Sequence, residues 1–265
     1  MKMQRVEAKK LRFVIITQDE PFYIAEFFEH FLRKIDFGKF MIPLIVVLPR
    51  FNESSLSLLK RMYSFYGPVD FLRRAIQFVT IKFSDNLGLV RRSVRSIARY
   101  YDIPVRKVLD VNDPEFIDEL RAMDLDVILS VAAPQIFKEA LLKVPKWGCV
   151  NVHSARLPKY RGMMPNFWAM YHGDRTAGIT VHLMDTKIDR GKIILQTEIP
   201  ISPNETLDAL MKRSKRAAAD LVIQALEQIR SGTVELRDYE GKGSYFSFPK
   251  REHVRQLRAR GYRLL

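Results

Sequence analysis

The feature that most constrains the fold of this chain is a regular alternation of short apolar runs with helical patterns through its first half. The runs are rich in Val, Ile and Leu, as in strands that are buried on both faces of a sheet. They are Leu11–Thr17, Pro43–Leu48, Phe78–Ile81 and Asp126–Ala132. Between them, residues 22–35 and 86–101 repeat apolar side chains at helical spacing. This alternation predicts an α/β protein with a Rossmann-like, doubly wound, mostly parallel sheet.

A different pattern begins at Gly178, where apolar and other residues alternate as far as Leu183. A second extended run, Ile193–Ile201, follows a turn, so the two segments predict a hairpin-like pair. Asn204 is expected to cap a long helix, and Gly232 to end it.

Composition limits the remaining organisation. The chain has 265 residues, of which 47% are hydrophobic, so it can bury a full core. We expect a catalytic domain over residues 1–232 and a short basic C-terminal extension over 233–265. Cys149 is the single cysteine, which excludes an internal disulfide and, with five scattered histidines, argues against a zinc cluster. With neither a signal segment nor a membrane span, we expect a cytoplasmic protein without metal or membrane partner.

The formal net charge of +14 is typical of chains that meet polyanions, whether nucleic acid, anionic membrane or phosphorylated small molecules. Lys and Arg come in bursts over residues 91–99, 212–216 and 250–263. Such bursts usually form solvated helix faces, so charge alone selects no partner.

The most informative stretch follows the apolar pair Cys149–Val150, where Asn151 and His153 stand two residues apart at the end of an expected strand. Residues at this spacing point to the same face of a strand. An amide N–H and a protonated imidazole could together polarise a carbonyl, as an oxyanion site requires. From these residues alone, a strand-end Asn in a turn and a structural His are the favoured interpretation.

Five motifs in order give this region a family resemblance. They are Asp126–Ala133, Asn151-x-His153, Leu157-Pro158-x-x-x-Gly162, Gly178-Ile-Thr180-Val-His182 and Ile188-Asp189-x-Gly191. The stretch resembles the active-site segment of the 10-formyltetrahydrofolate-dependent formyltransferases, which include glycinamide ribonucleotide, methionyl-tRNA and amino-sugar formyltransferases. The resemblance implies a folate-dependent transferase with N10-formyltetrahydrofolate as co-substrate and no metal.

Position by position, the resemblance places the family's catalytic Asn, His and Asp on Asn151, His153 and Asp189. Transfer of a formyl group to an amine passes through a tetrahedral carbon that bears an oxyanion. Asn151 and a protonated His153 would donate to that oxygen, and the carboxylate of Asp189 would favour the imidazolium and handle the amine proton. Asp185 is the competing carboxylate, and His182 is given no role.

The resemblance also implies which residues contact the substrates. Small side chains and backbone amides after the fourth apolar run would line the pterin ring, and the turn at Gly191 would let the backbone approach it. The residues expected on the folate side are Ala132, Ala133, Pro134, Gln135, Ile136 and Gly191. Those expected to contact the acceptor are Gln18, Asp19 and Arg161.

The turn Gln18-Asp19-Glu20-Pro21 departs from the glycines that glycinamide ribonucleotide formyltransferases place there for phosphate. Two carboxylates repel phosphate and Pro21 lacks an amide donor. Methionyl-tRNA formyltransferases carry a larger C-terminal barrel than the residues after Ile201 would form, whereas residues 245–251 resemble the short extension of sugar formyltransferase-like proteins. The expected acceptor is a nucleotide-linked amino sugar.

Several alternatives stay open at this point. They are formylation of methionyl-tRNA or another amine, hydrolysis of formyltetrahydrofolate, and folate or RNA binding without turnover. A homodimer is compatible with the sequence.

Overall fold

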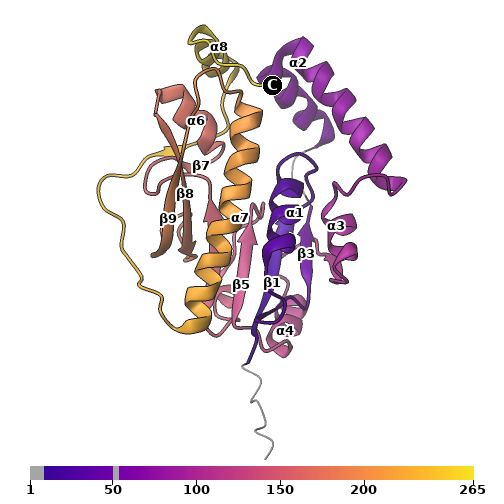
Figure 1. The fold of residues 1–265 in the computed structure, drawn as a ribbon, viewed down its shortest axis with the longest axis vertical. Helices are drawn as coiled ribbons and strands as arrows, with labels where there is room; N and C mark the ends of the chain where they lie inside the picture. The colour runs from indigo at the N-terminus through magenta and orange to yellow at the C-terminus, as the bar shows by residue number, and fades with distance from the viewer. Residues whose placement is uncertain (1–8, 50–53) are drawn as a thin grey trace, which may run out of the picture.

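The computed structural model describes residues 9–49 and 54–265, and its centre is a mostly parallel β-sheet with helices on both faces (Figure 1). The strand order is β4-β3-β1-β5-β6-β8-β9, and β2 pairs with β1. The strands of this sheet are β1 (Leu11–Gln18), β2 (Phe40–Met41), β3 (Ile45–Leu48), β4 (Val105–Lys107), β5 (Val127–Val131), β6 (Gly148–His153), β8 (Thr176–Leu183) and β9 (Ile193–Pro200). The predicted α/β class with a doubly wound, mostly parallel sheet is confirmed.

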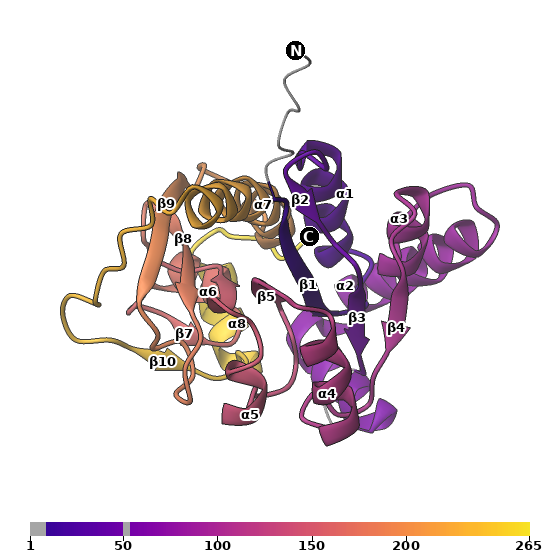
Figure 2. The ribbon, with the colours of Figure 1, turned by 90° about the horizontal axis from the view of Figure 1, so that it is seen from below.

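Helices cover both faces of the sheet, and Figure 2 shows α1 and α7 on one side and α4 and α5 on the other. Residues of α1, α3 and α7 are buried against one face and residues of α4 and α5 against the other. The helices are α1 (Ile24–Lys34), α2 (Ser55–Asn86), α3 (Val94–Tyr100), α4 (Pro114–Ala122), α5 (Glu139–Leu142), α6 (Pro165–His172), α7 (Leu207–Ser231) and α8 (Arg251–Ala259). In the described ranges, none of them has the length and apolar content needed to cross a bilayer.

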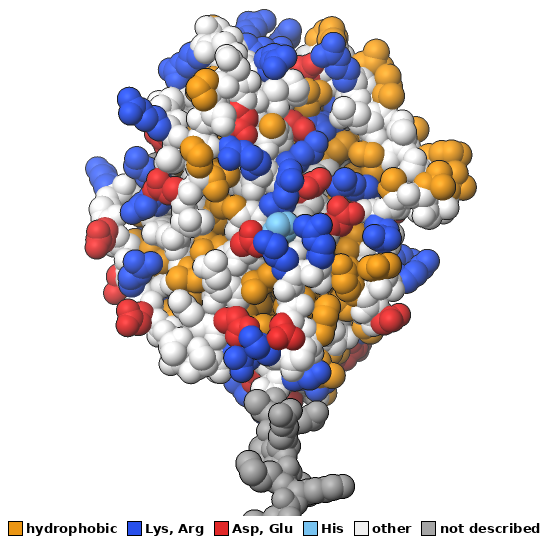
Figure 3. Space-filling model, viewed as in Figure 1, with side chains coloured by type: hydrophobic (Ala, Val, Ile, Leu, Met, Phe, Trp, Pro, Cys, Tyr) orange, Lys and Arg blue, Asp and Glu red, His pale blue; other side chains and the backbone are white. Residues whose placement is uncertain are grey.

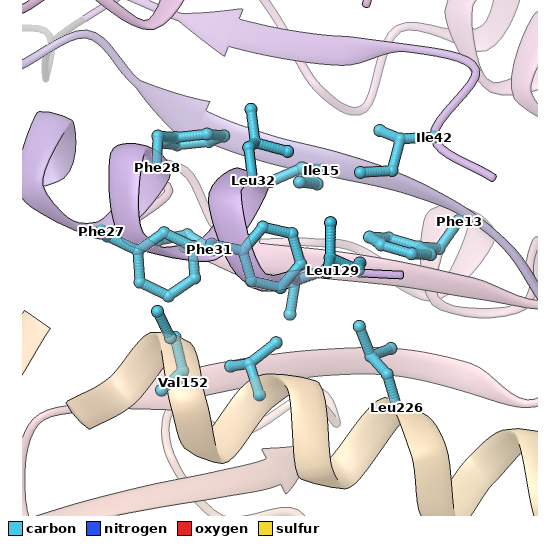
Figure 4. Packing of buried hydrophobic residues seen from close by; sticks show 14 of the residues in the cluster. Phe13, Ile15, Phe27, Phe28, Phe31, Leu32, Ile42, Leu129, Val152 and Leu226 are labelled. Carbon is cyan, nitrogen blue, oxygen red and sulfur yellow. The ribbon is translucent and has the colours of Figure 1, made fainter. Parts of the chain in front are cut away.

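The larger core lies between the sheet and the pair α1 and α7 (Figure 4). Phe27 and Phe31 of α1 stack with ring centroids 5.4 Å apart, and Phe13 of β1 meets Phe31 edge to face at 6.3 Å. Leu226 of α7 is 1% exposed beside them. This packing fixes β1 and β5 at the centre, so that their carboxyl ends reach one edge of the sheet together.

The apolar run Phe78–Ile81 is not a strand, because it lies within α2. A four-residue run carries little period information of its own, and the apolar residues around it continue at helical spacing. Two helical stretches meet at a kink within α2, where Gly67 adopts φ 75° and Pro68 lacks the N–H that would continue the first stretch.

The expected helix over residues 86–101 is also shorter than predicted, since only α3 forms. Ser93 caps α3 at its N-terminus, and the Asp85 carboxylate accepts from the backbone N–H groups of Arg92 and Ser93 at 2.6 and 3.1 Å. This capping interrupts the pattern and leaves Leu89 72% exposed.

The pair β8 and β9 and the long helix after it form as predicted, with one correction at the cap. Thr206, not Asn204, caps α7, because its side chain accepts from the N–H of Ala209 at 3.1 Å. Asn204 lies in the preceding turn at φ 61°. Gly232 ends α7 in the left-handed conformation, as expected.

The C-terminal segment returns to the sheet's carboxyl edge. β10 (Tyr245–Phe246) pairs in parallel with β7 (Arg161–Gly162), and α8 packs beside α2 and α6. Val254, Leu257 and Leu264 are buried there with Phe65 of α2 in a separate apolar cluster. The division of the chain at residue 232 stays a prediction. Residues of the 233–265 segment are part of this apolar cluster.

Candidate active site

Asn151 and His153 stand at the carboxyl end of β6 and point to the same face of the sheet. The neighbouring residues show which face it is: Val150 and Val152 pack toward α1 and α7, whereas Cys149 packs toward α5. Alternation along the strand therefore directs the Asn and His side chains to the α5 side, beyond the end of that short helix. The side-by-side placement that the spacing predicted is present.

Asp189 reaches these two residues from the loop between β8 and β9. One of its carboxylate oxygens, Oδ2, lies 3.9 Å from Nδ1 of His153 and accepts from the backbone N–H of Gly162 at 3.1 Å. Its other oxygen lies 3.7 Å from Nε2 of His182. The Asp189 side chain is 10% exposed. The structure thus brings the three predicted catalytic residues together, and it places His182 among them.

His182 is a site residue that the sequence interpretation left without a role. It stands opposite Asn151 in the β6–β8 register and is 2% exposed. Because a carbonyl only accepts, its Nδ1 must donate to the Leu183 carbonyl at 2.7 Å, which leaves Nε2 to accept from the Asn151 side-chain amide at 3.2 Å. Burial lowers the pKa of His182 to about 4, so the neutral tautomer with this polarity persists at neutral pH.

This arrangement orients the Asn151 amide. One hydrogen of its NH₂ group is directed at Nε2 of His182, so the second remains for a substrate oxygen. The motif that contains His182 was noted in the sequence, and its position two residues after Thr180 on the same strand face was the available signal.

His153 is oriented by the loop that follows β6. Its Nε2 donates to the carbonyl of Tyr160 at 2.9 Å, so only Nδ1 faces Asp189 and the site. The loop is held in turn by Thr180, whose hydroxyl donates to the Ala155 carbonyl at 2.7 Å and accepts from the N–H of Leu157 at 3.1 Å. The orientations of both histidines thus rest on backbone carbonyls.

Two glycines of the resemblance motifs are explained by close packing. A Cβ on Gly178 would lie 2.1 Å from the backbone nitrogen of Arg156, and one on Gly191 would lie 1.9 Å from the Leu183 carbonyl oxygen. Gly191 therefore lets the loop that carries Asp189 approach β8. The approach of this backbone to the pterin ring, which the sequence suggested, stays a prediction.

The residues expected on the folate side form the loop after β5. Ala132 adopts φ 51°, and Ala132, Ala133, Pro134 and Gln135 are partly buried while Ile136 is 62% exposed. Gln135 is held within the protein: its Oε1 accepts from the N–H of Val111 at 2.8 Å and its Nε2 donates to the Leu109 carbonyl at 2.6 Å. The loop follows the strand next to β6, so it adjoins the catalytic residues.

In the turn after β1, the side chains of Asp19 and Glu20 accept hydrogen bonds from backbone N–H groups. Glu20 accepts from the N–H groups of Phe22, Tyr23 and Ile24 at 2.7–3.2 Å and so fills the start of α1. Asp19 accepts from the N–H of Val94 at 3.0 Å. Gln18, the last residue of β1, is partly buried. Contact of Gln18 and Asp19 with an acceptor stays a prediction.

Arg161 and Tyr239 bring two buried polar atoms to the same place. Nε of Arg161 and the hydroxyl of Tyr239 have no hydrogen-bond partner among the described residues. Burial, followed by the nearby carboxylates of Asp189 and Asp185, raises the pKa of Tyr239. The Tyr239 hydroxyl is therefore neutral, and it makes no hydrogen bond to Asp189 among the described contacts. Sequence reasoning missed it, since no motif marks residue 239.

A hollow of about 190 Å³ lies on the other side of the loop after β6. None of the three catalytic candidates lines it; Ser154, Arg156, Tyr160, Arg175 and Glu198 do. In the described parts of the chain, no group of three or more His, Cys, Asp or Glu side chains is arranged to hold a metal ion.

Comparison with protein families and with curated sequences gives consistent matches. A family model described as formyl transferase matches residues 85–226. The methionyl-tRNA formyltransferase of Trichlorobacter lovleyi is 36% identical over 162 residues, which is 60% of this chain and 51% of that protein. That of Geobacter sulfurreducens is 38% identical over 144 residues, or 54% of this chain and 45% of that protein. The chain thus spans about half the length of the curated relatives it matches.

Solved structures share the fold over more of the chain. A sugar N-formyltransferase from Shewanella sp FDAARGOS_354 aligns with a TM-score of 0.59 at 18% identity, over 94% of this chain and 87% of that one. Glycinamide ribonucleotide transformylase 1 from Symbiobacterium toebii aligns with a TM-score of 0.59 at 15% identity, over 86% and 95%. At these identities the alignments show a common fold.

Proposed function

The chain belongs to the formyl transferase family, and on that premise we propose that it transfers the formyl group of N10-formyltetrahydrofolate to a primary amine. The observation that carries the proposal is the position of Asp189 between His153 and His182, beside Asn151. These are the groups that acyl transfer to an amine needs: donors for an oxyanion and a carboxylate for the moving proton.

In the proposed reaction the amine nitrogen attacks the formyl carbon, and the C=O electrons move onto oxygen. The second N–H of Asn151 donates to that oxyanion, since its first is held by His182. His153 presents Nδ1 toward Asp189 at 3.9 Å, and an imidazolium ring there would add positive charge beside the oxyanion.

The tetrahedral carbon then collapses with cleavage of its bond to N10 of the folate. The amine has lost one proton and N10 gains one, so the step is balanced by a single proton transfer. Asp189, directly or through a water, takes the proton from the amine and returns it to N10. The Gly162 N–H, which donates to Asp189 at 3.1 Å, would stabilise the carboxylate during this exchange.

For the acceptor we propose an amino sugar linked to a nucleotide. The carboxylate of Glu20 already satisfies three backbone N–H groups at the start of α1, which are the groups that would otherwise hold a phosphate there. This argues against glycinamide ribonucleotide. The alternative acceptor is methionyl-tRNA, after which the curated relatives are named.

The activity is tested by incubating the protein with 10-formyltetrahydrofolate and a panel of amines, and by following tetrahydrofolate, formate and formylated product separately. Formation of formylated product supports the proposal. Release of formate with an equal amount of tetrahydrofolate, at the same rate with and without amine, would identify a hydrolase instead. Folate should also raise the melting temperature as its concentration passes the dissociation constant. Folate stabilisation without turnover of any amine or water would indicate a binding protein.

Salt separates the two acceptors. A tRNA neutralises several basic side chains on binding, so its apparent affinity should fall steeply between about 50 and 200 mM salt. A nucleotide sugar carries few charges, and we expect its Michaelis constant to change by less than about fivefold over that range. Formylation of methionyl-tRNA, with affinity lost when Arg255, Arg258 and Arg260 become Ala, would assign the tRNA acceptor and leave the catalytic residues unchanged.

A further inference from the structure

The second stretch of α2, after the kink at Gly67, turns a row of large apolar side chains toward solvent. This outward stripe consists of Val69, Leu72, Ile76, Val79 and Phe83. Each of its members is 58–65% exposed. Their spacing of three and four residues places them on one helical face. A surface helix ordinarily buries such a face against the core.

The inner face of the same helix includes a buried charged residue. Arg74 is 8% exposed and donates to Asp208 of α7 at 2.5 Å and to the Tyr23 hydroxyl at 3.1 Å. Its guanidinium also lies 4.2 Å from the centre of the Phe22 ring. These contacts of Arg74 fix the rotation of α2 about its axis. The outward stripe, on the opposite face of the helix, is therefore held toward solvent.

The apolar surface extends beyond the stripe in both directions. Leu56, Leu59 and Tyr63 precede it on the first stretch of α2 and are 51–62% exposed, and Leu87 and Leu89 follow it at 58% and 72%. Figure 3 shows hydrophobic side chains gathered over α2 at the upper right of the molecule. A contiguous exposed apolar surface of this kind marks an interaction site.

The charge around this surface indicates the partner. Residues 55–100 contain nine Lys or Arg and two Asp. Arg74 faces inward and pairs with Asp208, so the other charged residues of this segment sum to +6. Arg73, whose side chain is 67% exposed, flanks the stripe. Association of two copies through this face would bring like charges together, whereas an anionic surface would neutralise them.

We propose that the outward stripe of α2 binds the surface of an anionic lipid bilayer, with the helix lying in the plane of the interface. Apolar side chains on one face and basic residues beside them are the combination that such binding uses. The expectation of no membrane partner rested on the lack of a spanning segment, and a helix that lies on the surface needs none.

The test is flotation of the full chain with vesicles of phosphatidylcholine, alone or mixed with phosphatidylglycerol. We expect binding to the mixed vesicles to exceed binding to the neutral ones by about tenfold or more, and to weaken as salt is raised. The double variant Ile76→Gln/Val79→Gln should lose about tenfold in binding to the mixed vesicles. Arg73→Gln should lose about fivefold in the same vesicles.

The matched control is Met41→Gln/Leu109→Gln, which removes two exposed apolar side chains away from α2 (45% and 82% exposed) and should leave binding unchanged. Circular dichroism and melting temperature establish that each variant is folded. Equal binding of the stripe variant and the control would overturn the proposal, as would absence of binding to mixed vesicles. A dimer in solution that Ile76→Gln/Val79→Gln dissociates would assign the face to a second copy instead. Flotation needs no turnover, so its outcome is independent of the formyl-transfer assay.

Discussion

The candidate active site and the outward stripe of α2 both depart from the usual rule that polar side chains are exposed and apolar side chains are buried. The site buries polar side chains, and the stripe exposes apolar ones. Around the site, His153 and His182 are buried at 9% and 2% exposure, and Asp189 is nearly so. On α2, Val79 and Phe83 are about two thirds exposed, at 65% and 64%. Departures from the sorting rule are expected where function is placed. The two buried histidines and Asp189 have hydrogen-bond partners inside the chain, whereas the apolar side chains of the stripe turn toward solvent. The first region therefore suits chemistry and the second suits docking.

The largest effect should come from the buried side of this comparison. Asp189→Ala should reduce the rate of formyl transfer by on the order of a hundred- to a thousandfold, because the carboxylate beside His153 and the proton acceptor are both lost. Asn151→Ala and His153→Ala should fall in the same range. Steady-state kinetics with melting curves measure both rate and folding.

Asp185→Ala is the control for that series, since Asp185 lies in the same loop and no histidine of the site forms an ion pair with it among the described contacts. We expect a milder loss. A rate near that of the parent for Asp189→Ala, or a larger loss for Asp185→Ala, would show that the carboxylate is wrongly assigned.

The next effect concerns the pH dependence of stability at His182. Its pKa is about 4 in the folded protein against an ordinary 6.5, so below pH 6.5 the unfolded chain binds a proton that the folded protein does not. The contribution of His182 to the free energy of unfolding is complete above pH 6.5. It falls by about 3 kcal/mol in all as the pH decreases toward 4. His182→Gln should show a shallower fall in urea unfolding between pH 7 and 4. Parallel curves for the two proteins would contradict the buried neutral imidazole.

A smaller effect is expected at the anchor that sets the direction of the stripe. Arg74→Met removes charge-assisted hydrogen bonds to Asp208 and Tyr23, while Asp208 keeps Lys212 at 2.8 Å, so we expect a loss of about 2 kcal/mol in unfolding free energy. The control Arg73→Met alters an exposed pair with Asp70 and should change stability by less than about 0.5 kcal/mol. Equal losses would mean that Arg74 does not anchor α2.

The smallest effect should be seen in the stripe itself. Ile76→Gln replaces an apolar side chain that is 58% exposed, so the unfolding free energy should change by less than about 0.5 kcal/mol and the rate of formyl transfer in solution should not change. By contrast, Leu226→Ala in α7 should cost about 2–5 kcal/mol, because that side chain is 1% exposed in the core. A stripe variant as unstable as Leu226→Ala would show that the face is buried in the working protein.

The two long helices show how far sequence patterns reach. Both α2 and α7 repeat apolar residues at helical spacing, and α7 was placed correctly because its stripe ends at Gly232 and faces the core. The run Phe78–Ile81 was interpreted as a strand because a short apolar run fits either period. Periodicity identifies an apolar face, but it does not say what that face meets.

The site was predictable to a similar depth. Asn151 and His153 lie on one strand, so their common face follows from local geometry. Their meeting with Asp189 was anticipated from the family resemblance alone. His182 and Tyr239 were missed because their importance comes from pairing across β6 and β8 and from the return of the C-terminal segment, contacts over long sequence separations that no local pattern encodes.

The sequence by itself therefore determined the alternation of strands and helices, the end of α7 at Gly232 and the residue types of the catalytic group, because these depend on backbone preferences and side-chain chemistry. Tertiary structure alone decided which nitrogen of His153 faces Asp189, which hydrogen of Asn151 is free and which face of α2 is outward. Each of those outcomes is set by one distant partner, such as the Tyr160 carbonyl or the Asp208 carboxylate. Such partners become neighbours only when the chain has packed.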